Sequence, residues 1–169
     1  MASQKITRAE YNQLLIEQTD KKKSEWATEI NDIAPLIRTK DPNDMVDASA
    51  FGLSYRVKLL EDIGFFLNEL VQEQTKIKQL KLEKFCLYST GLYLDGTRPT
   101  GAIMNNPLIG ISKLNASQRD LIISGDLADY EHTQEILTNT IEQLREYIKT
   151  IDSYMFAIKN RLEIFQILK

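Results

Sequence analysis

The last third of the sequence carries one regular row of apolar residues that requires a long helix. From Leu127 to Phe165, apolar side chains recur in alternating steps of three and four, and only Gln134 in the row is polar. This spacing predicts a helix of about 40 residues, about 60 Å long, with Asp126 as its N-cap. The side chains expected to form its apolar seam against other helices are Leu137, Ile141, Leu144, Ile148, Ile151, Met155, Ile158, Leu162 and Phe165.

A seam of this length needs a long partner helix. The segment from about Met45 to Tyr88 repeats apolar residues every seven positions and has a suitable length. We therefore expect a mainly α fold in which residues 45–169 form an antiparallel helical hairpin, joined by a loop over 90–125. Isoleucine at both types of seam position favours an oligomer larger than a dimer. A monomeric bundle that closes the seam internally would satisfy the same pattern.

Residues 1–44 are expected to form an N-terminal helical segment outside this hairpin. The stretch Thr7-Arg8-Ala9-Glu10 fits the Ser/Thr-x-x-Glu capping pattern, and apolar residues begin just after it. We expect a helix from Thr7 to about Ile33, followed by a break between Pro35 and Pro42.

The loop over 90–125 is rich in glycine and also contains two prolines. Within it, LIGISKL (108–114) and RDLIISGD (119–126) are short apolar stretches of strand length. They predict a small β-hairpin inside the loop-rich insertion.

Composition argues against catalysis and against metal binding. The chain has one cysteine and one histidine, and it lacks the phosphate-loop, dinucleotide, HExxH and GxSxG motifs. We expect a protein that is not an enzyme and uses no cofactor. Residues 1–15 lack a continuous apolar run, and no run reaches the roughly 20 residues of a membrane span, so we expect a cytoplasmic location without membrane contact.

A cluster of lysines precedes the loop, although the net charge of the chain is −3. The stretch TKIKQLKLEKFCLYSTG (75–91) holds four lysines against one glutamate, and Tyr88 follows four residues after Lys84. We expect lysines spaced by three to share one strip of the helix, where they could contact phosphates while the tyrosine stacks on a base. A solvated helix end with lysines that favour the helix dipole explains the same residues without a ligand.

Three segments of the sequence resemble a known family. YSTG (88–91) after the basic helix KQLKLEKFCL, SKLNASQRDLIISGD (112–126) and IKTIDSYMFAIKNRLEIFQ (148–166) resemble, in this order, segments of the UvsY-type recombination mediators of T-even-like phages. The resemblance covers about 76–166. The chain departs from the family pattern at Leu87 and Thr90, and its N-terminal part is longer than usual for the family.

The resemblance implies a helical homo-oligomer, in the family a heptameric ring, that binds single-stranded DNA. Such a mediator helps a RecA-like recombinase displace a single-strand-binding protein in DNA recombination, repair and replication. One of the family's basic DNA-contact positions falls on Lys84, and the other falls near Leu82, where Lys81 is the nearest lysine. The residues expected to bind DNA are Lys76, Lys78, Lys81, Lys84, Tyr88 and, from the loop, Arg98.

Two other interpretations remain open. The chain could be a structural or scaffolding helical protein, of a virus for example, that only assembles with proteins. It could also be a monomeric adaptor whose seam closes internally. Neither would bind a nucleic acid.

Overall fold

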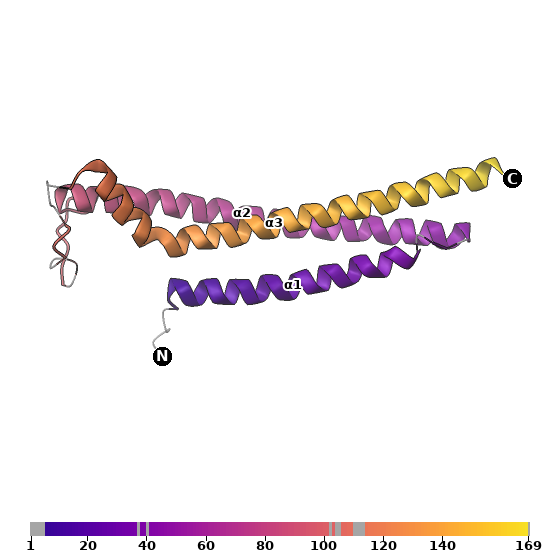
Figure 1. Cartoon of the computed structure of the whole chain (residues 1–169), viewed down its shortest axis with the longest axis horizontal. Helices are drawn as coiled ribbons and strands as arrows, with labels where there is room; N and C mark the ends of the chain where they lie inside the picture. The colour runs from indigo at the N-terminus through magenta and orange to yellow at the C-terminus, as the bar shows by residue number, and fades with distance from the viewer. Residues whose placement is uncertain are drawn as a thin grey trace. The chain divides into compact units, whose positions relative to one another are not determined.

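The computed structural model of the protein is mainly helical (Figure 1), which confirms the mainly α class that the sequence predicts. It describes residues 6–36, 38–39, 41–101, 103, 106–109 and 114–168. Within these ranges the chain forms three helices and no strand. The helices are α1 (Arg8–Leu36), α2 (Pro42–Thr90) and α3 (Ala116–Ile167).

Reciprocal side-chain caps fix where α1 and α3 begin. The Thr7 N–H donates to the Glu10 carboxylate (2.7 Å), and the Glu10 N–H donates to the Thr7 hydroxyl (3.2 Å), as the capping pattern predicted. Asn115 and Gln118 exchange the same kind of bonds at 3.0 and 2.9 Å ahead of α3. The prediction that Asp126 caps the last helix is therefore wrong, since Asp126 lies inside α3.

The segment between α2 and α3 is shorter than predicted, and those of its residues that the structure describes form neither helix nor strand. Gly91 ends α2: its φ of 74° is left-handed, and its N–H donates to the Leu87 carbonyl at 2.9 Å. The strand predicted over 119–126 is wrong because these residues belong to α3. Of the other predicted strand, 108–109 lie in a turn, while 110–113 are outside the described residues. Short apolar runs do not distinguish a strand from a buried helix.

Contacts divide the chain into two compact units, and each unit takes pieces of all three helices. Unit 1 comprises Met1–Asn12 and Leu70–Glu135, and unit 2 comprises Gln13–Glu69 and Ile136–Lys169. Most of α1 therefore belongs to unit 2, together with parts of α2 and α3.

The seam of α3 in unit 2 is buried by the chain itself. Its most buried members, at most 3% exposed, are Leu137, Ile141, Leu144, Ile151 and Ile158. The other predicted seam residues are partly buried, namely Ile148, Met155, Leu162 and Phe165. The most buried seam side chains are thus covered within one copy, as a bundle that closes the seam internally would require. The expectation that the seam joins copies of the chain stays a prediction.

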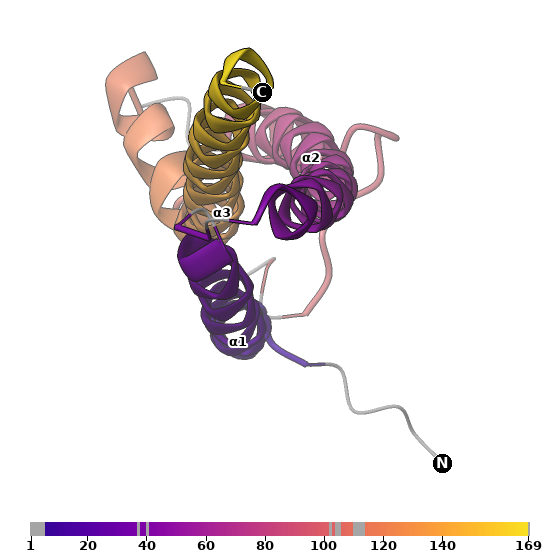
Figure 2. The same cartoon turned by 90° about the vertical axis from the view of Figure 1, so that its right-hand side faces the viewer.

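The C-terminal part of α3 lies beside the start of α2 in unit 2 (Figure 2). Met45, Ala48 and Ile158 form a buried cluster there, and Leu162 and Phe165 pack against it. Removal of these apolar side chains from water stabilises the contact. The last turns of the heptad row therefore cover the first turns of α2.

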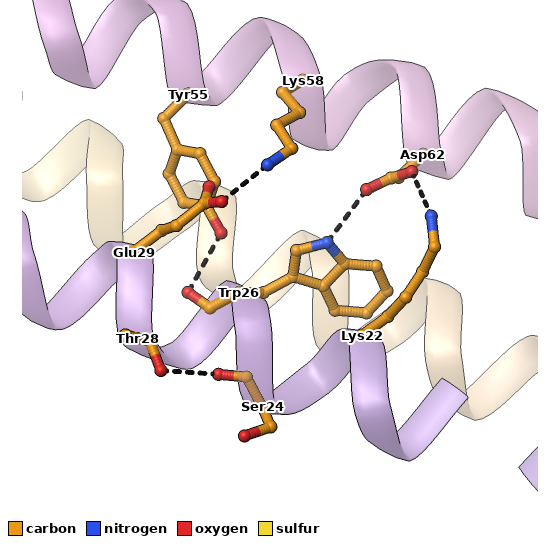
Figure 3. A network of polar contacts seen from close by, with 8 residues as sticks. All are labelled: Lys22, Ser24, Trp26, Thr28, Glu29, Tyr55, Lys58 and Asp62. Atoms are coloured by element: carbon orange, nitrogen blue, oxygen red, sulfur yellow. Dashed lines mark hydrogen bonds and ion pairs between the residues drawn. The ribbon is translucent and has the colours of Figure 1, made fainter. Parts of the chain in front are cut away.

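Trp26 of α1 is the centre of the polar and aromatic contacts in unit 2 (Figure 3). It is 2% exposed, and its indole N–H donates to the Asp62 carboxylate at 2.9 Å. The same carboxylate pairs with Lys22 at 3.0 Å, and the Tyr55 hydroxyl donates to the Trp26 carbonyl at 3.0 Å. The Phe66 ring meets the indole edge-on at 6.3 Å between centroids. These contacts hold α1 against α2.

We expect Trp26→Ala to lower the free energy of unfolding by about 3–5 kcal/mol, because it leaves a large cavity and removes a partner of Asp62. Urea unfolding followed by circular dichroism measures the change. Phe156→Ala is the control: this side chain is 66% exposed, so its loss should change the same free energy by less than about 0.5 kcal/mol. Equal effects of the two substitutions would contradict the assigned core.

Candidate nucleic-acid interface

The four lysines of α2 between positions 76 and 84 do not all share one face of the helix. Three residues advance about 300° around an α-helix, so each step of three rotates the next side chain by about 60°. Lys78 is exposed and has no ion pair among the described residues. Lys81 and Lys84, at successive steps of three, turn toward α3. The predicted single strip is therefore a row that winds from solvent toward the neighbouring helix.

Both inward-turning lysines are paired with acids of α3 in unit 1. The Lys81 ammonium lies 2.9 Å from the Glu131 carboxylate, with both side chains nearly half exposed. The Lys84 ammonium lies 2.7 Å from Asp126, and these side chains are 29% and 34% exposed. A well-exposed ion pair such as that of Lys81 with Glu131 contributes about 0–1 kcal/mol to stability. A phosphate can therefore replace Glu131 at Lys81 more easily than it can replace the less exposed Asp126 at Lys84.

Tyr88 is a core residue of unit 1 and not a platform for a base. It is 5% exposed, packs with Ile123 and Leu127, and donates its hydroxyl to Asp126 at 2.5 Å. Burial and this hydrogen bond raise the pKa of Tyr88 to about 12. The predicted stacking role of Tyr88 is therefore wrong, because its ring does not reach solvent.

Phe85 is the exposed aromatic residue that sequence reasoning missed. Its side chain is 48% exposed and borders a shallow hollow of about 390 Å³ that Lys81, Asp120 and Ile123 also line. The Arg119 guanidinium lies 5.5 Å from the ring centroid. Phe85 follows Lys81 by four residues, so both project from the same side of α2. The spacing of four between Lys81 and Phe85 can be read from the sequence, but the sequence does not show that Phe85 is exposed while Tyr88 is buried.

Lys76 and Arg8 meet around one ring on another side of unit 1. The Lys76 ammonium lies 5.4 Å and the Arg8 guanidinium 4.6 Å from the centroid of Tyr130. Arg8 also forms an ion pair with the Glu73 carboxylate and donates to Thr133 at 3.1 Å. This group ties the start of α1 into unit 1. Lys76 thus projects from a different side of α2 than Lys78 and Lys81. No feature of the sequence indicated that Arg8 contacts the same ring as Lys76.

Two segments that carried the family resemblance touch in unit 1. Arg119 at the start of α3 donates to the Ser89 hydroxyl near the end of α2 at 2.7 Å. Arg98, the cation expected from the loop, lies between these two segments in the sequence, and its side chain is exposed.

The described part of the chain offers neither a metal centre nor a membrane span. No group of three or more histidine, cysteine, aspartate or glutamate side chains in it is placed to hold a metal ion. None of its helices has the length and apolar character needed to cross a bilayer.

Asp126 should stabilise unit 1 through its ionised form. Burial raises the pKa of Asp126, but hydrogen bonds from Lys84 and Tyr88 outweigh burial and hold the pKa below its usual 3.8. Asp126→Ala leaves the Tyr88 hydroxyl unpaired, so we expect it to lower the free energy of unfolding at neutral pH by about 1–2 kcal/mol.

The contribution of a carboxylate with a lowered pKa is present above its ordinary pKa and disappears as pH falls through its folded-state value. The difference between the wild type and Asp126→Ala should therefore shrink below pH 3.8, as measured by urea unfolding across pH. Glu131→Ala, in an exposed pair, is the control and should cost less than about 0.5 kcal/mol. A difference that does not depend on pH would refute the role of the ionised group.

Comparison with known proteins identifies no relative. The sequence matches no protein-family model, and neither a curated protein nor a solved structure matches the chain.

Proposed function

We propose that this protein is a non-enzymatic recombination mediator that binds single-stranded DNA. In this proposal it acts in the cytoplasm as a homo-oligomer and helps load a RecA-like recombinase onto DNA covered by a single-strand-binding protein. The resemblance of three ordered segments supports the proposal. Two of these segments are joined by the hydrogen bond between Arg119 and Ser89, so they belong to one structural neighbourhood.

The observation that carries the proposal is the spacing of two cations and one aromatic ring on α2. Lys78, Lys81 and Phe85 follow one another by three and four residues, which places them on one helical face. All three side chains are exposed. Lysines neutralise phosphates, and an exposed ring offers a surface on which any base can stack. Phe85 thus takes the role that the sequence assigned to Tyr88.

The surrounding acids limit the affinity of each copy. Glu131 pairs with Lys81, and the chain carries a net charge of −3, so a strand must compete with carboxylates for the lysines. Weak sites repeated over several copies bind a long strand by avidity, which raises the affinity without new contacts. A mediator needs such binding because it must release the strand to the recombinase.

The proposal includes an antiparallel pairing of α2 and α3. In unit 1, Lys81 pairs with Glu131 and Lys84 with Asp126, so residue numbers rise along α2 as they fall along α3. In unit 2, Arg56 likewise donates to Asp152 at 2.7 Å. Contacts between α2 and α3 in this order are those expected of two antiparallel helices in a helical hairpin.

A helical adaptor or scaffold without nucleic-acid binding is the second candidate function. It is favoured by the ion pairs at Lys81 and Lys84, which give these lysines partners within the chain. It is also favoured by the burial of the α3 seam, which removes one route to assembly.

A gel-shift titration with a short single strand at two salt concentrations distinguishes these functions. The double substitution Lys78→Ala and Lys81→Ala should weaken binding at least tenfold at low salt. It should also reduce the slope of log K against log salt by about 1.4, which is about 0.7 for each lost phosphate contact. Lys149→Ala with Lys159→Ala is the matched control, since it removes the same charge from two lysines that are likewise exposed. Absence of binding by the wild type at low salt would support the adaptor.

Phe85→Leu tests the stacking surface separately from charge. Leucine keeps an apolar side chain at the hollow but offers no aromatic face, so we expect an affinity loss of about 1–3 kcal/mol with an unchanged salt slope. The same titration gives both quantities. Unaltered affinity in Phe85→Leu would exclude stacking on this ring.

A further inference from the structure

The face of α2 that points away from the core of unit 2 carries an exposed apolar row. We call it the outer stripe. Its large side chains are 37–55% exposed and are Val46, Leu53, Val57, Leu60 and Leu67. Scattered exposed apolar residues are ordinary on a protein surface, but a contiguous row marks an interaction surface.

The outer stripe follows coiled-coil spacing. With the exposed small residues Ala50 and Gly64 included, its steps alternate between four and three from Val46 to Leu67, which spans three heptads and about 33 Å. None of the seven positions is charged. The core-facing residues of the same segment, such as Leu59 and Phe66, form a separate row that packs inside unit 2.

The residue types along the outer stripe suit a parallel pair of helices. In heptad notation, Ala50, Val57 and Gly64 occupy a positions, whereas leucine occupies the d positions from Leu53 to Leu67. A β-branched residue at a, here Val57, with leucine at d favours two parallel strands. An added Cβ at Gly64 would meet nothing within 4 Å, so this position leaves room for a close approach by another helix.

The charges that flank the outer stripe are complementary to the charges that flank the outer stripe of a second copy. Arg56 occupies a g position and Glu61 the e position five residues later. In a parallel pair, a g residue faces the e residue five positions further along the partner helix, so Arg56 meets Glu61 twice by symmetry. An antiparallel pair brings e against e and g against g, which does not join them. Within the described part of the chain, Arg56 donates its Nε–H to Asp152, and the side chain of Glu61 is exposed.

We propose that the outer stripe binds the outer stripe of a second copy of this chain in a parallel two-stranded arrangement. Apolar self-complementarity supplies the contact, and the paired charges of Arg56 and Glu61 set its direction. This surface replaces the α3 seam as the place where copies meet. The proposal does not depend on DNA binding.

Sedimentation equilibrium of the full chain, without DNA, tests the interface. The wild type should self-associate, and Leu53→Arg with Leu60→Arg should raise the dissociation constant at least tenfold. Both leucines are about half exposed, so the helical content measured by circular dichroism should be kept. Phe156→Arg, on an exposed side chain of α3, is the control and should associate like the wild type. A monomeric wild type, or a double variant that associates normally, would overturn the proposal.

Cross-linking tests the direction of the pair. In a Cys86→Ser background, Val57→Cys should form disulfide-linked dimers on mild oxidation, because a parallel register places position 57 beside its own counterpart. Phe156→Cys should not cross-link at a comparable rate. Glu61→Arg should weaken association by opposing Arg56 with like charge, and adding Arg56→Glu should restore it. Equal cross-linking at 57 and 156, or no effect of charge reversal, would refute the parallel register.

Discussion

The structure depends on the burial of one long apolar face of α3 by the same chain. Leu144 and Ile151 are fully covered in unit 2, and Ile158 packs on the start of α2. A helix with this heptad pattern would otherwise expose its seam to water at a cost proportional to the apolar area. Within one copy of the chain, the buried part of this face is therefore covered by the other helices of unit 2.

In unit 1, hydrogen bonds and ion pairs between α2 and α3 determine which lysines of α2 already have a carboxylate partner. Lys84 and Tyr88 converge on Asp126, which makes this carboxylate part of the packing between α2 and α3. Lys81 has a weaker, exposed partner in Glu131. The cations of α2 thus differ in how readily they can change partners, although they look alike in the sequence. Their value to a ligand follows from their neighbours and not from their number.

Local features were predictable from the sequence, whereas partners distant in the sequence were not. The start of α1 followed from Thr7 and Glu10, because a capping box lies within four residues. The start of α3 was missed because Asn115 and Gln118 lie in a stretch whose glycines indicated a loop. Tyr88 was misassigned because its burial depends on α3. The contact of Arg8 with α2 and α3 joins residues far apart in the chain, and no periodicity encodes it.

Trp26 is the single tryptophan of the chain, and it lies in the core of unit 2. Indole emission therefore reports on one unit alone, since unit 1 holds tyrosines but no tryptophan. Opening of the contacts around Tyr88 would be silent in that signal, while loss of the contacts to Asp62 would shift it toward longer wavelengths. Intrinsic optical probes can thus show whether the two halves of the molecule melt together or one after the other.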